Sequence, residues 1–221
     1  RQMCIRDSGP SEAEEVEMVA GPLLQHLLNK GGRLILVSTH AEGPALAERL
    51  LAGLSGAGEG PERVVNLGYQ PGQAVGVQGL LADLAGRTLY RSGQPAAQAA
   101  VMEGVRSARD VGLVIVLAGQ VEDLRTWVEQ VSARYPDLPV VAGVSARVEP
   151  IARPYLERTG AGVLKGLVAG LPGATVYQGF LGMEDEYARY YLQSLTLGQW
   201  AVAMLMVIGA VVFLVGGGKA R

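Results

Sequence analysis

Hydrophobic residues follow two different spacings along most of the chain. In several segments they recur every three or four positions, which is the spacing of one buried face of an α-helix. Short and nearly continuous apolar runs lie between these segments, and such runs are typical of parallel strands buried on both faces. The pattern predicts helices over residues 12–30, 44–54, 73–84, 94–108, 121–134, 151–156 and 163–171, and strands over residues 33–38, 64–67, 111–118 and 140–144.

This alternation of helices and strands predicts an α/β fold for residues 11–182. We expect a mostly parallel sheet with helices on both faces, in a Rossmann-like three-layer arrangement. Gly56–Gly60 is expected to be a surface loop, and Pro172-Gly173 should interrupt the last helical region. A sandwich built only from strands is disfavoured, because the segments between the strands have helical spacing.

The C-terminal part of the chain has a different pattern. No charged side chain occurs from Tyr190 to Gly218. A helix needs about 20 residues to cross a hydrocarbon core about 30 Å thick. Residues 195–218 therefore predict a transmembrane helix, with Trp200 as an interfacial anchor and residues 183–194 as a juxtamembrane linker. The alternative is a buried core helix, which would normally carry a polar face.

Charges around the apolar segment predict an orientation. Lys219 and Arg221 follow the segment, whereas an acidic group with the single basic residue Arg189 precedes it. Because basic residues favour the cytoplasmic side of a membrane, we expect a cytoplasmic C-terminus. The α/β domain would then lie on the extracytoplasmic face of the cell membrane. This topology calls for a second, upstream membrane helix, so the protein is expected to be single-pass or two-pass.

The first eight residues stand apart from the rest. Residues 1–8 have neither helical nor strand spacing, and the string resembles translated sequencing-adapter sequence. We interpret residues 1–8 as a non-native leader and expect no part for them in the fold. A natural disordered leader is the alternative. The single cysteine of the chain, Cys4, lies in this segment.

Composition excludes several classes of function. Nineteen Lys and Arg residues against 21 Asp and Glu residues give a net charge of −2, with no basic excess to hold a nucleic acid. One cysteine and two histidines cannot build a disulfide framework and leave little for a metal site, so no metal ligands are predicted. Neither G-x-G-x-x-G nor a P-loop motif follows a predicted strand. The cofactor, if there is one, stays unknown.

Polar residues gather where the predicted strands end. In an open parallel sheet, ligands bind beyond the carboxyl ends of the strands. Ser38 and His40 are the catalytic candidates, because a hydroxyl near an imidazole can supply a nucleophile and a base. However, no acid is evident to orient His40, and the helix dipole explains Glu122 and Asp123 without acid–base chemistry. The predicted ligand-binding residues are Thr39, Glu42, Asn66, Tyr69, Gly72, Gly119, Gln120, Ser145 and Arg147.

Several motifs occur in a recognisable order along the chain. Among them are the segments Val65–Gly72, Pro139–Ser145 and Gly166–Tyr177. Over residues 14–180 the chain resembles an uncharacterised family of bacterial and archaeal membrane-anchored proteins. The resemblance implies an α/β domain between N- and C-terminal transmembrane helices, and it implies no known activity. The family usually carries Lys and Glu where this chain has Pro172 and Val176, so a role for those two polar groups is absent here.

Three functions follow from these observations. The absence of an acid–base–nucleophile set favours a membrane-tethered module that binds a ligand or a partner protein, and leans against an enzyme. One alternative is a membrane-bound hydrolase or transferase that uses the loops at 38–43 and 66–72. Another is a structural subunit of a membrane complex, with a protein partner in the membrane. The expected partners include the lipid bilayer through residues 195–218 and no nucleic acid.

Overall fold

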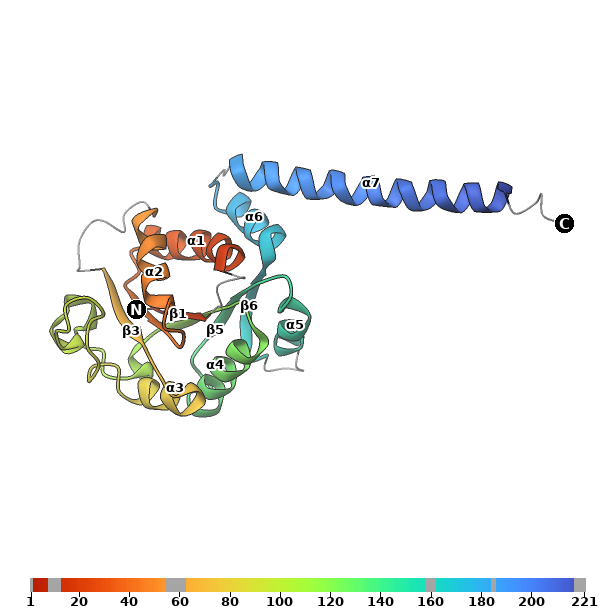
Figure 1. Ribbon diagram of the computed structural model, residues 1–221. Helices are drawn as coiled ribbons and strands as arrows, with labels where there is room; N and C mark the ends of the chain where they lie inside the picture. Colours follow the sequence, from red (N-terminus) through yellow and green to blue (C-terminus); the bar gives the residue numbers. More distant parts are fainter. Residues whose placement is uncertain (1, 8–12, 55–62, 158–161, 184–185, 217–221) are drawn as a thin grey trace.

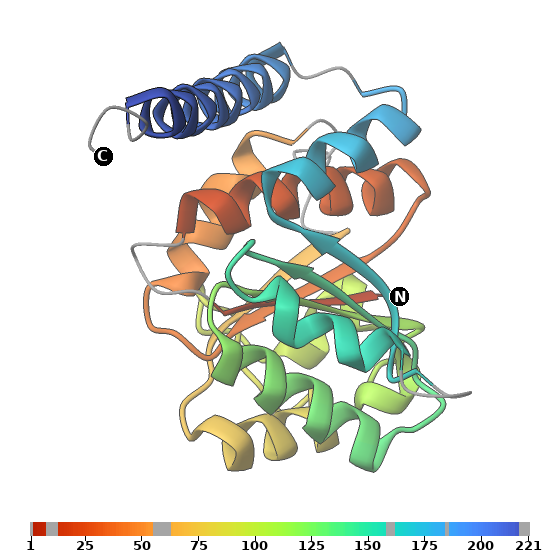
Figure 2. The same ribbon diagram turned by 90° about the vertical axis from the view of Figure 1, so that its right-hand side faces the viewer.

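A computed structural model describes residues 2–7, 13–54, 63–157, 162–183 and 186–216. Six parallel strands form one sheet between two layers of helices (Figures 1 and 2). The α/β prediction with helices on both faces is therefore confirmed. The strands are β1 (Gln2–Asp7), β2 (Leu34–Ser38), β3 (Val64–Tyr69), β4 (Leu113–Ala118), β5 (Val140–Val144) and β6 (Leu164–Ala169), in the order β3-β2-β1-β4-β5-β6.

Each face of the sheet is covered by its own helices. One hydrophobic cluster lies under α1 (Ala13–Asn29), α2 (Gly43–Ala52) and α6 (Gly170–Phe180). The cluster on the opposite face lies under α3 (Gln73–Ala82), α4 (Val121–Arg134) and α5 (Glu149–Glu157). Trp127 of α4 is fully buried in this second cluster. The layers bury both faces of the strands, which explains why the strands are apolar runs rather than alternating patterns.

The first strand lies inside the sheet, although its sequence carries no strand pattern. β1 is hydrogen-bonded to β2 on one side and to β4 on the other, and Cys4 is in register with Leu36 and Ile115. The expectation that residues 1–8 take no part in the fold is thus wrong for residues 2–7. Only three consecutive apolar residues occur there, and pairing with two neighbouring strands overrides this weak local preference. The interpretation of the segment as non-native stays a prediction.

The helix predicted over residues 94–108 is not formed. Three short 3₁₀ turns replace it: η2 (Ala96–Gln98), η3 (Ala100–Met102) and η4 (Ala108–Asp110). Gly104 has a φ of 69°, which no residue of a right-handed α-helix adopts. Val101 and Val105 are nevertheless buried. Residues 94–108 therefore bury their apolar side chains in the core from a series of short turns rather than from one helix.

The prediction of a helix over residues 163–171 is also wrong. Leu164–Ala169 forms β6, which is paired with β5 at the edge of the sheet, and α6 begins only at Gly170. A short apolar run does not distinguish a strand from a buried helix by spacing alone. Pro172 lies in the first turn of α6, where a missing backbone N–H is tolerated, so it does not interrupt a helix.

The last described element is one long helix, α7 (Glu186–Gly216), of 31 residues. It extends away from the α/β domain, and its start replaces most of the predicted linker at 183–194 (Figure 1). None of the helices in the described ranges is long and apolar enough to span a membrane, so the predicted transmembrane helix at 195–218 is not supported. Gly56–Gly60, Lys219 and Arg221 lie outside the described residues.

Candidate functional site

A histidine and an aspartate meet at the carboxyl edge of the sheet. His40 follows β2, and Asp123 lies in the first turn of α4, just after β4. Nε2 of His40 lies 3.3 Å from both Oδ1 and Oδ2 of Asp123. The two residues are 83 positions apart in the sequence. The pair is therefore a product of the fold, which brings the ends of β2 and β4 to one edge.

Local structure holds the histidine at this position. The backbone N–H of His40 donates to Oγ of Ser38 at 3.0 Å, which closes a turn directly after β2. The side chains of His40 and Asp123 are 27% and 14% exposed. Asp123 orients the imidazole, either as an ion pair with the protonated ring or as acceptor of a hydrogen bond from Nε2–H. A partly exposed, oriented imidazole can donate to or accept from a polar ligand.

The pair lies at the point where the strand order reverses. The chain leaves β1 towards α1 on one face of the sheet, and it leaves β4 towards α4 on the opposite face. In open α/β sheets this switch point creates a crevice outside the carboxyl ends of the strands. His40 and Asp123 come from the strands β2 and β4 that flank β1. Their location matches the position at which such folds hold ligands.

Asp123 corrects the expectation that no acid orients His40. Its signal in the sequence was its place at the start of a helix that follows a strand, which puts it at the same sheet edge as His40. The strand order, which brings β4 next but one to β2, was needed to see the contact. The spacing of hydrophobic residues along the chain does not reveal the order of the strands in the sheet.

Ser38 is not presented as a nucleophile. Its side chain is only 2% exposed, and its hydroxyl oxygen accepts the backbone N–H of His40. The imidazole of His40 instead contacts the carboxylate of Asp123 through Nε2. A nucleophile needs access to substrate and a hydrogen bond to its base. The turn-forming role that sequence also allowed for Ser38 matches its observed hydrogen bond.

Four of the predicted ligand-binding residues have local structural roles. The Asn66 amide donates to the carbonyl oxygen of Pro44 at 3.0 Å and accepts from the N–H of Gly68 at 2.9 Å. The Ser145 hydroxyl donates to the carbonyl oxygen of Gly119 at 3.1 Å, which joins the ends of β5 and β4. Gly72 precedes α3 with a φ of 99°, a left-handed conformation that glycine adopts without strain.

The other predicted residues lie along the same edge with accessible side chains. Thr39 is half-buried, and the exposed residues are Glu42, Tyr69, Gln120 and Arg147. Glu42 and Gln120 precede α2 and α4, and neither makes a side-chain capping hydrogen bond. These residues surround the strand ends, so the predicted edge is assembled. Their binding roles stay predictions.

Sequence reasoning missed one further residue at this edge. Oε1 of Glu15, in the first turn of α1, accepts the backbone N–H of Ala146 at 3.0 Å. This contact ties the start of α1 to the connection between β5 and α5. It also adds a carboxylate to the carboxyl edge, beside Asp123 and the exposed Glu42 and Glu122. The charge of this edge is therefore mainly acidic.

Neither a metal centre nor a related protein identifies the site. Within the described ranges, no group of three His, Cys, Asp or Glu side chains is arranged to hold a metal ion. No protein-family profile matches this chain, and searches of curated proteins and of solved structures found no match either. The resemblance to a membrane-anchored family therefore stays a prediction, and the site must be interpreted from its own geometry.

Proposed function

We propose that the carboxyl edge around His40 and Asp123 binds a small polar ligand, and that the protein is a binding module rather than an enzyme. The observation that carries the proposal is the His40–Asp123 pair at the switch point of the sheet. A carboxylate and an oriented imidazole provide convergent polar groups at the place where α/β folds bind ligands. Exposed Gln120, which directly precedes α4 and so lies close to Asp123 in the sequence, can extend the contact surface.

The acidic surroundings favour a class of ligand. Glu15, Asp123 and Glu122 lie near the starts of α1 and α4 and offset the positive ends of these helix dipoles. Anionic ligands therefore gain less binding free energy here than at a helix start without nearby carboxylates. Ligands rich in hydroxyl or amino groups, which donate hydrogen bonds to carboxylates, fit better.

A hydrolase or transferase is the second candidate function, and Asp123 is the observation that favours it. A carboxylate that orients an imidazole is a familiar arrangement for a general base. Against this candidate stands the buried hydroxyl of Ser38, which leaves His40 without that nucleophile. A catalytic role would therefore use His40 to activate a water or a substrate hydroxyl.

Thermal unfolding in the presence of small ligands tests the binding proposal. We expect sugars, nucleosides or amines to raise the melting temperature of the full chain, and we expect this rise to disappear in His40→Ala and Asp123→Asn. Glu129→Gln is the matched control, because it removes an exposed negative charge from the same helix, away from the first turn of α4. Failure of all three ligand classes to stabilise the wild type would reject the proposal, as would undiminished stabilisation of both site variants.

We also propose that α7 inserts its apolar side chains into a lipid bilayer. Residues 204–208 are all exposed and apolar, and five consecutive residues reach every side of a helix. Trp200 and Phe213 are 67% and 79% exposed on the same helix. A continuous apolar surface of this kind is a mark of membrane or protein association. The predicted orientation, with the domain on the extracytoplasmic face, remains part of the proposal.

Flotation with phosphatidylcholine vesicles tests the lipid proposal. The full chain should float with the vesicles, and Val207→Arg should reduce the floating fraction, because a charge in the apolar part of a bilayer is costly. Val176→Arg on α6 is the control, since it adds the same charge at an exposed apolar position of the domain. A wild-type protein that stays at the bottom of the gradient would contradict the proposal.

A further inference from the structure

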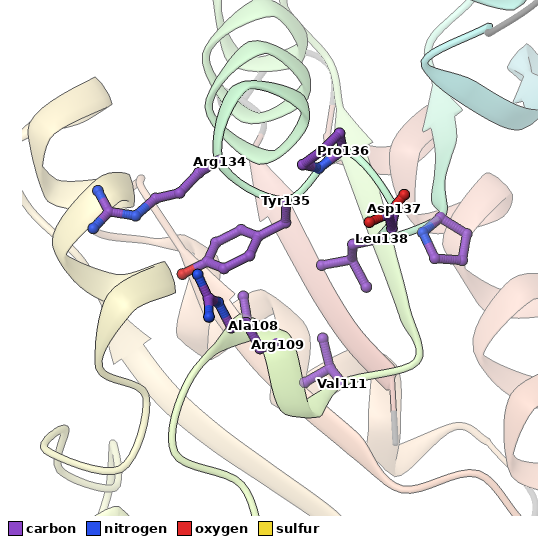
Figure 3. Close-up of a pocket in the computed structure, with 9 residues that line it drawn as sticks. Ala108, Arg109, Val111, Arg134, Tyr135, Pro136, Asp137 and Leu138 are labelled. Carbon is purple, nitrogen blue, oxygen red and sulfur yellow. The ribbon is translucent and has the colours of Figure 1, made fainter.

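A second concave site lies at the opposite, amino edge of the sheet. Val111 precedes β4 and Pro139 precedes β5, so the site lies away from His40 and Asp123. Its volume is about 390 Å³ (Figure 3). We call it the amino-edge cleft, and its lining residues are Ala108, Arg109, Val111, Arg134, Tyr135, Pro136, Asp137, Leu138 and Pro139.

Two guanidinium groups line the cleft without a carboxylate partner in the described ranges. Arg109 belongs to η4, and its Cζ lies 6.0 Å from the centroid of the Tyr135 ring. Arg134 is the last residue of α4, and both arginines are exposed. Four other arginines each form an ion pair with a glutamate: Arg49, Arg91, Arg125 and Arg153. Arg109 and Arg134 therefore keep their hydrogen-bond donors available to a ligand.

The segments that carry the two arginines are held in place. Ser107 and Asp110 form a capping box around η4, in which the N–H of Arg109 donates to the Ser107 hydroxyl. The hydroxyl of Tyr135 donates to the carbonyl oxygen of Leu81 at 3.0 Å, and the residue is only 8% exposed. A fixed backbone and a fixed ring reduce the cost of ordering the cleft when a ligand binds.

The remaining lining residues indicate the chemistry that the rest of a ligand should have. Val111, Leu138 and Pro139 provide an apolar wall beside the Tyr135 ring. Figure 3 shows the two arginines towards one side of Tyr135, and Asp137 on the other side. Two positive charges and one negative charge leave the cleft net positive. The carboxylate of Asp137 would repel a second anionic group at the apolar end.

We propose that the amino-edge cleft binds a small ligand with a single oxyanion group, a phosphate or a carboxylate, on an apolar body. The guanidinium forks of Arg109 and Arg134 bind the oxyanion, because planar N–H pairs match the spacing of its oxygens. The apolar body packs on Val111 and Leu138. The cleft is separate from the carboxyl edge. The binding proposal for one site can therefore be rejected while the proposal for the other holds.

Calorimetric titration of the full chain with phenyl phosphate, benzoate and inorganic phosphate tests the proposal. We expect saturable binding of at least one aromatic anion, tighter than that of inorganic phosphate. The tighter of phenyl phosphate and benzoate identifies the preferred oxyanion. Arg109→Gln and Arg134→Gln should each weaken this binding about tenfold, because each removes charge-assisted hydrogen bonds.

The controls separate the cleft from general charge effects. Arg125→Gln removes the same charge from the same helix outside the cleft, and it should change the affinity less than about twofold. His40→Ala should leave binding of the aromatic anion unchanged, and thermal unfolding checks that every variant is folded. Absent binding of both aromatic anions, inorganic phosphate that binds as tightly as they do, or full affinity in both cleft variants would overturn the proposal.

Discussion

At the scale of single residues, two histidines join distant parts of the chain. His40 contacts Asp123 at the carboxyl edge, whereas His26 of α1 contacts Tyr177 of α6 with 2.6 Å between Nδ1 and the hydroxyl oxygen. The second pair lies between two helices of the same layer. Burial raises the pKa of Tyr177 above its ordinary value of 10.0, because desolvation disfavours the phenolate. Loss of the Tyr177 proton at alkaline pH should therefore weaken the packing between α1 and α6.

Burial of Tyr177 should make the folded protein less stable at alkaline pH. A raised pKa in the folded state means that the folded protein keeps a proton that the unfolded chain loses. The associated stability is present below pH 10 and is lost as the pH rises through the raised value. Tyr177→Phe should thus show a smaller fall in the free energy of unfolding between pH 9 and pH 11 than the wild type, measured in urea. At pH 8 it should cost about 1 kcal/mol, for the lost hydrogen bond to His26.

Tyr90→Phe is the control for the loss of a tyrosine hydroxyl, because Tyr90 is 43% exposed. An identical pH dependence in Tyr177→Phe and Tyr90→Phe would show that burial of Tyr177 does not contribute to alkaline stability.

At the scale of elements, prediction from sequence succeeded where spacing and length agreed. The bounds of α4 and β5 match the predicted ranges, because α4 has a long apolar stripe and β5 is a short apolar run between clear breaks. The helix predictions for residues 94–108 and 163–171 were wrong because the apolar spacing of these segments fits more than one structure. The edge with the candidate site was predicted from strand ends. The contact between His40 and Asp123 was not, because it depends on the strand order.

The side chain of Asn66 in β3 holds the start of α2 against the sheet. The Asn66 amide links the carbonyl oxygen of Pro44 to the N–H of Gly68, so Asn66→Ala removes one hydrogen bond from each of these backbone groups. We expect a loss of about 1–3 kcal/mol in the free energy of unfolding, measured by urea denaturation. Gln70→Ala removes an amide of the same region whose hydrogen bond to the carbonyl oxygen of Pro71 is exposed, and it should cost less than about 0.5 kcal/mol. Equal losses in the two variants would contradict a structural role for Asn66.

At the scale of the whole molecule, β1 connects the two halves of the sheet. β2 and β3 lie on one side of it, and β4, β5 and β6 lie on the other. The same strand separates β2 and β4, whose ends carry His40 and Asp123. The geometry of the candidate site therefore depends on a strand that the sequence pattern did not predict. The distance between His40 and Asp123 is set by β1, although neither residue belongs to β1 or directly follows it.

The position of β1 between two strands makes it sensitive to proline. Cys4→Pro removes a backbone N–H from a strand that is paired on both sides, where proline is not tolerated. It should lower the free energy of unfolding by about 2 kcal/mol or more, since a ladder hydrogen bond is lost between buried neighbours. Cys4→Ala keeps the backbone donor and is the control. If both variants are as stable as the wild type, residues 2–7 do not complete the sheet, and the interpretation of a non-native leader gains support.

The two tryptophans of the chain lie in opposite environments, and this gives the protein a built-in optical readout. Trp127 is fully enclosed by the core, whereas Trp200 is 67% exposed on α7. The intrinsic fluorescence should therefore contain a blue component that resists quenching by acrylamide and a red component that acrylamide removes. Unfolding of the domain shifts the first component, and transfer of α7 out of water shifts the second, so one emission spectrum reports on both events separately.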